Sequence, residues 1–283
     1  MDSLKIYQTA KQGTASGRGP SYWATPMLCG RKAYLQETEK EAFDADRQSD
    51  AMRTGSFYHY LHETWQRGSI SPDTCIDTSV VQDPAWTEAV RLFHFISSMR
   101  PKDYYGVTLG VEFKLPVTPF HKTQVEEFFG IYGDDCPTGQ VDLLVNMDAE
   151  TVRRIETDRG IDLRGPGLYI VDYKTAAARA SDMSSRADYT QTVQAMTYPV
   201  LWNLSGGQGV KGMLFEVLVK HKHLGANSMQ TFFSAHDPQH FDIVRNAVRI
   251  ARASKLRGRA NPYACYHKGY ECYFLKNNQC SRM

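Results

Sequence analysis

The sequence has no long apolar run and almost no excess of charge. No stretch approaches the roughly 20 consecutive apolar residues of a membrane helix, and the opening MDSLKIYQTAKQGTASGRGP has no apolar signal-peptide core. The 33 lysines and arginines nearly balance 31 acidic residues, which leaves a formal net charge of +2. We therefore expect no membrane association and a cytoplasmic location (the host cytoplasm if the protein is viral). Nothing marks the whole chain as a polyanion binder.

Two families of enzyme motif are also missing. There is no His-Glu-x-x-His pattern of zinc proteases and no Gly-x-x-x-x-Gly-Lys-Ser/Thr phosphate loop. Any motor activity driven by ATP would therefore have to come from a partner. No internal repeat or long low-complexity segment is present.

The composition that is present is typical of a folded protein. The chain has 283 residues and 42% hydrophobic content, enough for a substantial core. No shift in composition marks a domain boundary. We expect a polar lead-in over residues 1–21 and a single domain over residues 22–283.

Helical and strand-like patterns alternate along this domain. Helices are expected over residues 22–40, 49–66, 83–99, 187–203 and 237–256. The third can begin with Asp83 as its N-cap and Pro84 at its first position. Strands are expected over residues 107–117, 125–133, 139–147, 167–175, 210–220 and 228–235. This order indicates an α/β fold with a mixed sheet. The polar segment 148–166 is expected to form a surface loop or a hairpin that contacts substrate.

The strand-like run GLYIVDYKT ends in two charged residues, Asp172 and Lys174. Because they are two residues apart in a strand, both side chains point to the same face. Taken alone, the pair fits a structural salt bridge better than an active site. If 139–147 and 167–175 are neighbouring strands, Asp142 joins Asp172 at one end of the sheet, and Glu112 could join them. Clustered carboxylates of this kind suit Mg²⁺ or Mn²⁺.

Other residues around this pair carry a specific resemblance. In order, the chain contains Gly55-x-x-x-His59, Gly139-x-x-Asp142, Asp172-Tyr173-Lys174 and Gln194-x-x-x-Tyr198. This series resembles the RecB-type branch of the PD-(D/E)XK nuclease superfamily, over roughly residues 22 to 280. The resemblance implies a restriction-endonuclease-like fold, in which helices flank a mixed central sheet, with a helical N-terminal part and a Cys-rich C-terminal tail.

The resemblance also implies roles for individual residues. It implies a divalent metal ion, Mg²⁺ or Mn²⁺, bound by His59, Asp142, Asp172 and the backbone carbonyl of Tyr173. Lys174 would be catalytic, and Gln194 and Tyr198 would support the site or contact DNA. Glu112 is a further candidate ligand, although a solvent-facing glutamate fits its surroundings equally well. Val141 replaces the family's proline, and the 148–166 insert lengthens the spacing between the two aspartates.

Three of the six cysteines lie in the last nineteen residues. Cys265, Cys272 and Cys280 need one more ligand for a four-coordinate site, and Cys29 is the candidate. The arrangement resembles the 4Fe–4S staple of AddB-type and CRISPR-adaptation nucleases, with one cysteine before the core and three after it. The spacing departs from their tighter Cys-x-x-Cys pattern. Zn²⁺, with His267 as an alternative ligand, and unliganded buried thiols remain the other interpretations. Cys75 and Cys136 are expected to be packing residues.

Several basic residues are candidates for phosphate contacts. They are Arg31, Lys32, Arg179, Arg186 and the run Arg245, Arg249, Arg252, Lys255, Arg257 and Arg259. The alternative for the run is a solvated helix face.

Together these features predict a metal-dependent deoxyribonuclease, more an exonuclease than an endonuclease, in DNA recombination, repair or replication. Similar free-standing proteins occur in phages. Its substrate would be single-stranded DNA or duplex ends. Candidate protein partners are a second copy of the chain or proteins of recombination and replication. The competing hypothesis is a non-catalytic DNA-binding or scaffold subunit, against which the intact Asp172–Lys174 pair argues.

Overall fold

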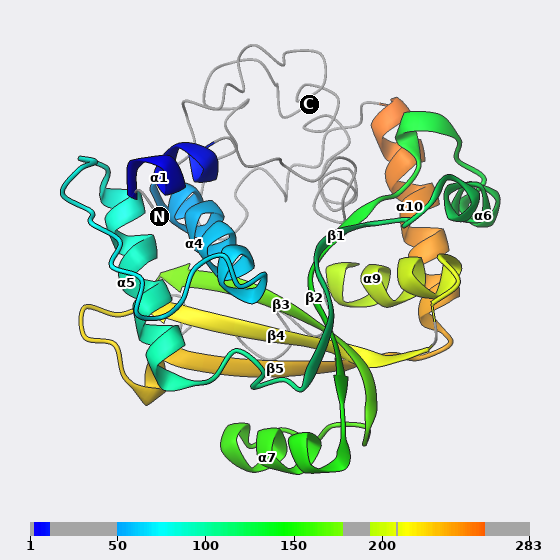
Figure 1. Cartoon of the computed structure of the whole chain (residues 1–283). Helices are drawn as coiled ribbons and strands as arrows, with labels where there is room; N and C mark the ends of the chain where they lie inside the picture. The colour runs from blue at the N-terminus through cyan, green and yellow to red at the C-terminus, as the bar shows by residue number, and fades with distance from the viewer. Residues whose placement is uncertain (1–2, 12–49, 178–192, 208, 258–283) are drawn as a thin grey trace.

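A computed structural model of the chain describes residues 3–11, 50–177, 193–207 and 209–257 (Figure 1). The helix expected over 22–40 and all four cysteines of the expected staple lie outside these residues. The same is true of Arg31, Lys32, Arg179 and Arg186.

The centre of the molecule is a mixed five-stranded sheet with the strand order β1-β2-β3-β4-β5. The strands are β1 (Val107–Leu115), β2 (Gly139–Met147), β3 (Gly167–Ala177), β4 (Val210–Lys220) and β5 (Met229–Ala235). All neighbours pair antiparallel except β3 and β4, which are parallel. Five of the six strands expected from the sequence are thereby confirmed, and β2 and β3 are neighbours as expected.

Helices pack on both faces of this sheet because the strand residues alternate between two cores. One core joins Val171 and Leu214 to α1 (Ser3–Lys11), α4 (Asp50–Gln66), α5 (Pro84–Met99) and α7 (Ala149–Arg159). The other joins Ile170 and Phe215 to α6 (Pro119–Phe129), α9 (Val193–Leu204) and α10 (His240–Arg257). Figure 1 shows α4 and α5 on one side of the molecule and α9 and α10 on the other. The predicted α/β fold is confirmed.

Helix α6 corrects the strand expected over residues 125–133. The apolar residues of that stretch gave it a strand-like composition. However, Thr118 caps a helix through its side chain, with Pro119 at the first position, and Gly130 ends it with a φ of 65°. Val125 and Phe129 are one helical turn apart and both are buried.

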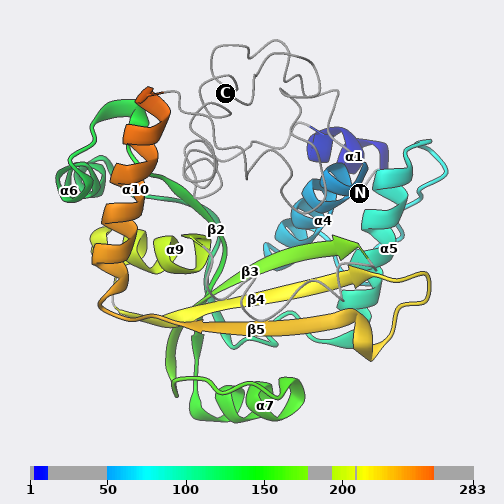
Figure 2. The same ribbon diagram turned by 180° about the vertical axis from the view of Figure 1, so that it is seen from behind.

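Helix α7 likewise corrects the loop or hairpin expected over residues 148–166. The Asp148 side chain accepts a hydrogen bond from Thr151 N at 2.8 Å, and Gly160 ends the helix with a φ of 62°. Val152 and Ile155 are buried. Viewed from behind in Figure 2, α7 lies at the opposite end of β2 from α6.

Part of the expected polar lead-in belongs to the packed structure. Ile6 of α1 is buried, and the Tyr7 ring contacts the Phe57 ring of α4 with centroids 5.7 Å apart. Cys136 is buried as expected, whereas Cys75 is exposed and is not a packing residue. None of the helices in the described part of the chain has the length and apolar character of a membrane span.

Candidate active site

Three side chains from three different elements converge on one point. His59 comes from α4, Glu112 from β1 and Asp142 from β2, and one donor atom of each lies within 4.8 Å of the others. His59 Nδ1 is 3.3 Å from Asp142 Oδ2 and 3.8 Å from Glu112 Oε1. Among the described residues, this is the histidine–carboxylate group with metal-ligand geometry.

Glu112 reaches this point through an unusual backbone conformation. Its φ is 46°, in the left-handed region that residues other than glycine rarely adopt. The flanking pairs Val111–Leu143 and Phe113–Val141 keep the β1–β2 register. Gln140 Nε2 donates a hydrogen bond to Glu112 Oε2 at 2.6 Å. Such strain persists where surrounding structure enforces it, and it is concentrated at functional sites.

Asp142 is held from two sides. Its Oδ2 accepts a hydrogen bond from the backbone N–H of Tyr173 at 2.8 Å and faces His59. Burial alone would raise the pKa of Asp142, but the charge and hydrogen bond of His59 lower it. Burial also lowers the pKa of His59, but attraction and hydrogen bonding to Asp142 outweigh it and raise that pKa to about 10.

Asp172 and Lys174 form an ion pair beside this group. Lys174 Nζ is 2.5 Å from Asp172 Oδ2, and Gln194 Nε2 of α9 donates to Asp172 Oδ1 at 2.7 Å. Burial raises the pKa of Asp172 to about 6, because the opposing effect of Lys174 is incomplete and Asp142 adds repulsion. Asp172 is not in the set of donors that meet within 4.8 Å, although it is close enough to Asp142 for their charges to interact.

The two glycines of the motif series lie where elements contact one another. A Cβ on Gly139 would lie 2.8 Å from Cε1 of Tyr198, so only glycine leaves room for that ring against β2. A Cβ on Gly55 would lie 3.4 Å from Thr175 Oγ1, which shows how closely α4 approaches β3 one turn before His59. Burial raises the pKa of Tyr198, and the nearby Asp172 and Asp142 raise it further. The tyrosine therefore stays protonated.

The residues at this point fit a hard divalent cation. Two carboxylates and one imidazole supply oxygen and nitrogen donors, and two negative groups close together, one buried and one half-buried, favour a cation between them. The three donor atoms lie within 4.8 Å of one another, close enough to hold one ion such as Mg²⁺ or Mn²⁺.

Two side-chain contacts in and near the site, Gln140–Glu112 and Arg100–Glu216, were not predicted from the sequence. Gln140 is two residues before Asp142, so strand alternation could have placed both on one face. His62, three residues after His59 on α4, is a buried packing residue, and the centres of its ring and the Tyr173 ring are 3.8 Å apart. The pair Arg100–Glu216 spans 116 positions of sequence, and no local pattern points to it.

The basic helix α10 lies farther along the sheet and packs on α6. Arg245 pairs with Asp242 at 2.5 Å, and its guanidinium carbon lies 5.4 Å from the Phe128 ring centre. Arg249 Nε lies 3.5 Å from the carbonyl oxygen of Phe129. Two of the candidate DNA-contact arginines thus also make intramolecular contacts.

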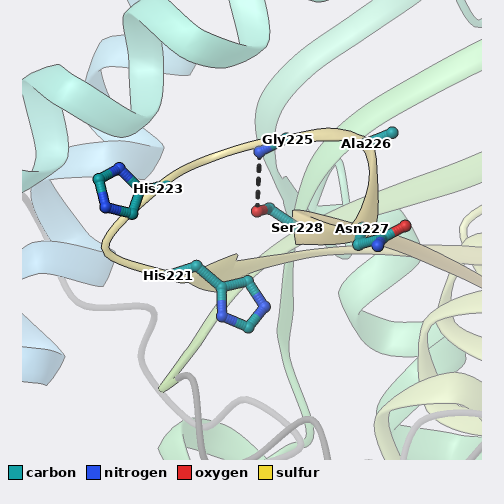
Figure 3. A pocket seen from close by; sticks show the side chains of 6 residues that line it. All are labelled: His221, His223, Gly225, Ala226, Asn227 and Ser228. Atoms are coloured by element: carbon teal, nitrogen blue, oxygen red, sulfur yellow. Dashed lines mark hydrogen bonds between the residues drawn. The ribbon is translucent and has the colours of Figure 1, made fainter.

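A separate open cavity of about 380 Å³ lies at the turn between β4 and β5 (Figure 3). His221, His223 and residues 225–228 line it, and Gly225 N donates to Ser228 Oγ at 3.1 Å. The two imidazole rings do not point toward one another in Figure 3, so they form no shared metal site. This cavity is no part of the site around His59.

Comparison with known proteins assigns the chain to a family. No curated protein matches it significantly. A family model, described as the PD-(D/E)XK nuclease superfamily, matches residues 20–280, nearly the whole chain. The mixed sheet flanked by helices agrees with the restriction-endonuclease-like fold of this family of metal-dependent nucleases. The chain belongs to the PD-(D/E)XK nuclease superfamily.

Proposed function

We propose that the chain is a Mg²⁺- or Mn²⁺-dependent deoxyribonuclease that acts as an exonuclease on single-stranded DNA or duplex ends. The observation that carries this proposal is the convergence of His59, Glu112 and Asp142 next to the Asp172–Lys174 pair. The carboxylates of Glu112 and Asp142 repel each other when they lie this close, and a bound cation would relieve that repulsion.

Each residue has a distinct task in this proposal. His59, Glu112, Asp142, Asp172 and the Tyr173 carbonyl would hold the cation. The cation would supply positive charge at the phosphoryl oxygen and favour attack by water. Lys174 would place its ammonium where negative charge develops on the phosphate. Gln194 would fix the Asp172 carboxylate through the bond seen at 2.7 Å, and Tyr198 would support the Gln194 helix.

The finer assignments extend this proposal. We place the chain in the RecB/AddB-type branch, with Cys29, Cys265, Cys272 and Cys280 holding a 4Fe–4S cluster. Arg31, Lys32, Arg179, Arg186, Arg245, Arg249 and Arg252 would contact backbone phosphates. The process served would be DNA recombination, repair or replication.

Labelled DNA tests the activity and its direction. Linear single- and double-stranded DNA, labelled at the 5′ or 3′ end, and circular DNA are incubated with Mn²⁺. An exonuclease shortens linear DNA from one end and leaves circles intact, whereas cleavage of circles would contradict the exonuclease assignment. Lys174→Met should lose the activity, and Lys222→Met, at an exposed lysine of the β4–β5 turn, should keep it. DNA binding without cleavage by the wild type would indicate a scaffold subunit instead.

Spectroscopy and metal analysis test the cluster. Protein purified without oxygen should be brown and absorb near about 400 nm, as iron–sulfur proteins with thiolate ligands do. Bound zinc without that absorption would contradict the 4Fe–4S assignment.

A further inference from the structure

A buried ion pair lies on the α4–α5 face of the sheet, beneath the Asp172-Tyr173-Lys174 segment. Arg100, directly after α5, donates from both terminal guanidinium nitrogens to the two carboxylate oxygens of Glu216 on β4. The two side chains are 3% and 1% exposed. The Tyr105 hydroxyl donates to the same carboxylate, which completes a closed polar cluster.

The pair is adjacent to Tyr173. Glu216 is the pairing partner of Tyr173 in the parallel β3–β4 ladder. The Arg100 guanidinium carbon lies 5.8 Å from the centre of the Tyr173 ring. Because side chains alternate along a strand, Tyr173 points to this face while Asp172 and Lys174 point to the other. The backbone N–H of Tyr173 meanwhile binds Asp142.

The same cluster holds α4, the helix that carries His59. The His62 ring lies 3.8 Å from the Tyr173 ring at an interplanar angle of 35°, and the Tyr58 ring lies 5.9 Å from the His62 ring. The stacked His62 therefore joins α4 to β3 one turn after His59.

We propose that Arg100 and Glu216 are positioning residues that fix β3 and α4 relative to one another, so that His59 and Asp142 meet at the metal site. A buried ion pair contributes little net stability, because desolvation opposes the attraction. A bidentate guanidinium–carboxylate contact instead fixes the orientation of the two side chains relative to one another. This inference rests on the proposed metal-dependent function. It identifies the residues that keep His59 and Asp142 in position relative to one another.

Exchanging both charged residues for apolar ones separates positioning from stability. The variant R100M/E216L removes both charges at similar volume but leaves the buried Tyr105 hydroxyl without its acceptor, so it should remain folded with a loss of stability no larger than that of one unpaired hydroxyl. Its affinity for Mn²⁺, measured by calorimetry, should fall about 10- to 100-fold, the usual effect of losing a residue that orients a metal ligand. The kcat of DNA cleavage should fall with it. The matched control is R91M/E88L, a half-buried pair of α5 with a 2.7 Å contact, which should leave Mn²⁺ affinity unchanged.

Wild-type Mn²⁺ affinity in a folded R100M/E216L variant would overturn the inference. If this variant does not fold, R100K decides the question, because lysine keeps the charge and loses the bidentate contact. Folded R100K should bind Mn²⁺ at least about 10-fold more weakly, and unchanged affinity would overturn the inference. Calorimetry also separates the two proposals. Wild type that binds Mn²⁺ and cleaves no DNA contradicts the proposed function and leaves the positioning test intact.

Discussion

At the scale of single residues, Glu112 links backbone strain to the site. Its left-handed backbone places a carboxylate within reach of His59 and Asp142. Burial, together with repulsion from Asp142, raises the pKa of Glu112. The ionised Glu112 carboxylate is therefore destabilised in the metal-free protein. The geometry is explained if a cation completes the site.

Replacing Glu112 with asparagine should therefore separate stability from function. Asparagine tolerates the left-handed region better than glutamate and carries no charge. In EDTA, we expect the free energy of unfolding of Glu112→Asn to stay equal or rise by up to about 1 kcal/mol. Cleavage with Mn²⁺ should fall at least about 10-fold. Chemical denaturation and a cleavage assay measure both, and a clear loss of stability with wild-type activity would refute this account of Glu112.

A second residue-scale prediction concerns Gly139. Alanine there would place its Cβ 2.8 Å from the Tyr198 ring, so the ring or β2 must move. We expect Gly139→Ala to lose about 1–3 kcal/mol of stability, as overpacked cores do. Cleavage should fall because Gln194 shares the helix of Tyr198. The control is Gly209→Ala, whose Cβ would meet nothing within 4 Å. Equal thermal unfolding of both variants would contradict the prediction.

At the scale of elements, the sequence predicted the helices and strands that have a clear apolar pattern or a clear helix cap. The short apolar run within 139–147 and the capped start at Asp83 were sufficient to predict β2 and α5. Helices α6 and α7 were missed because short segments depend on their caps, Thr118 and Asp148, more than on their composition. Motif spacing predicted His59, Asp142, Asp172, Lys174 and Gln194 as site residues, and the structure brings these side chains near one another. It could not locate Arg100–Glu216, whose partners meet only through the β4 register.

The junction of β5 and α10 should make stability depend on pH. Burial lowers the pKa of His236 and His240, and Asn203 Nδ2 lies 3.1 Å from His236 Nε2. Because these two histidines bind protons more readily in the unfolded chain, their contribution to stability is complete above pH 6.5 and is lost as the pH drops below it. In EDTA, His236→Gln should show a smaller fall between pH 6.5 and the folded pKa. Equal slopes of unfolding free energy against pH would contradict this prediction.

At the scale of the whole molecule, the candidate ligands lie where the two cores meet along the sheet. Helix α4, on one core, supplies His59, and helix α9, on the other, supplies Gln194. Strands β1, β2 and β3 supply the carboxylates between them. The site therefore depends on packing of both faces, which is why distant residues can position it.

The charge of α10 gives a prediction at this scale. Arg252→Gln should weaken DNA binding at all sequences and reduce the slope of log K against log[salt] by about 0.7 to 0.9, the value for one phosphate contact. Arg153→Gln on α7, at the opposite end of β2 from α6, is the control. Fluorescence anisotropy at several salt concentrations measures both slopes. An unchanged slope for Arg252→Gln would favour a solvated helix face.

The dependence of DNA cleavage on Mn²⁺ in wild type and Asp142→Asn tests the central claim most directly. Asp142 contacts both His59 and the backbone of Tyr173, and asparagine keeps its shape while it removes the charge. We predict that wild-type cleavage rises with Mn²⁺ to saturation and stops in EDTA. The folded variant should stay at the EDTA background over the same range. Equal Mn²⁺-dependent cleavage by the two proteins would contradict the assignment of this site.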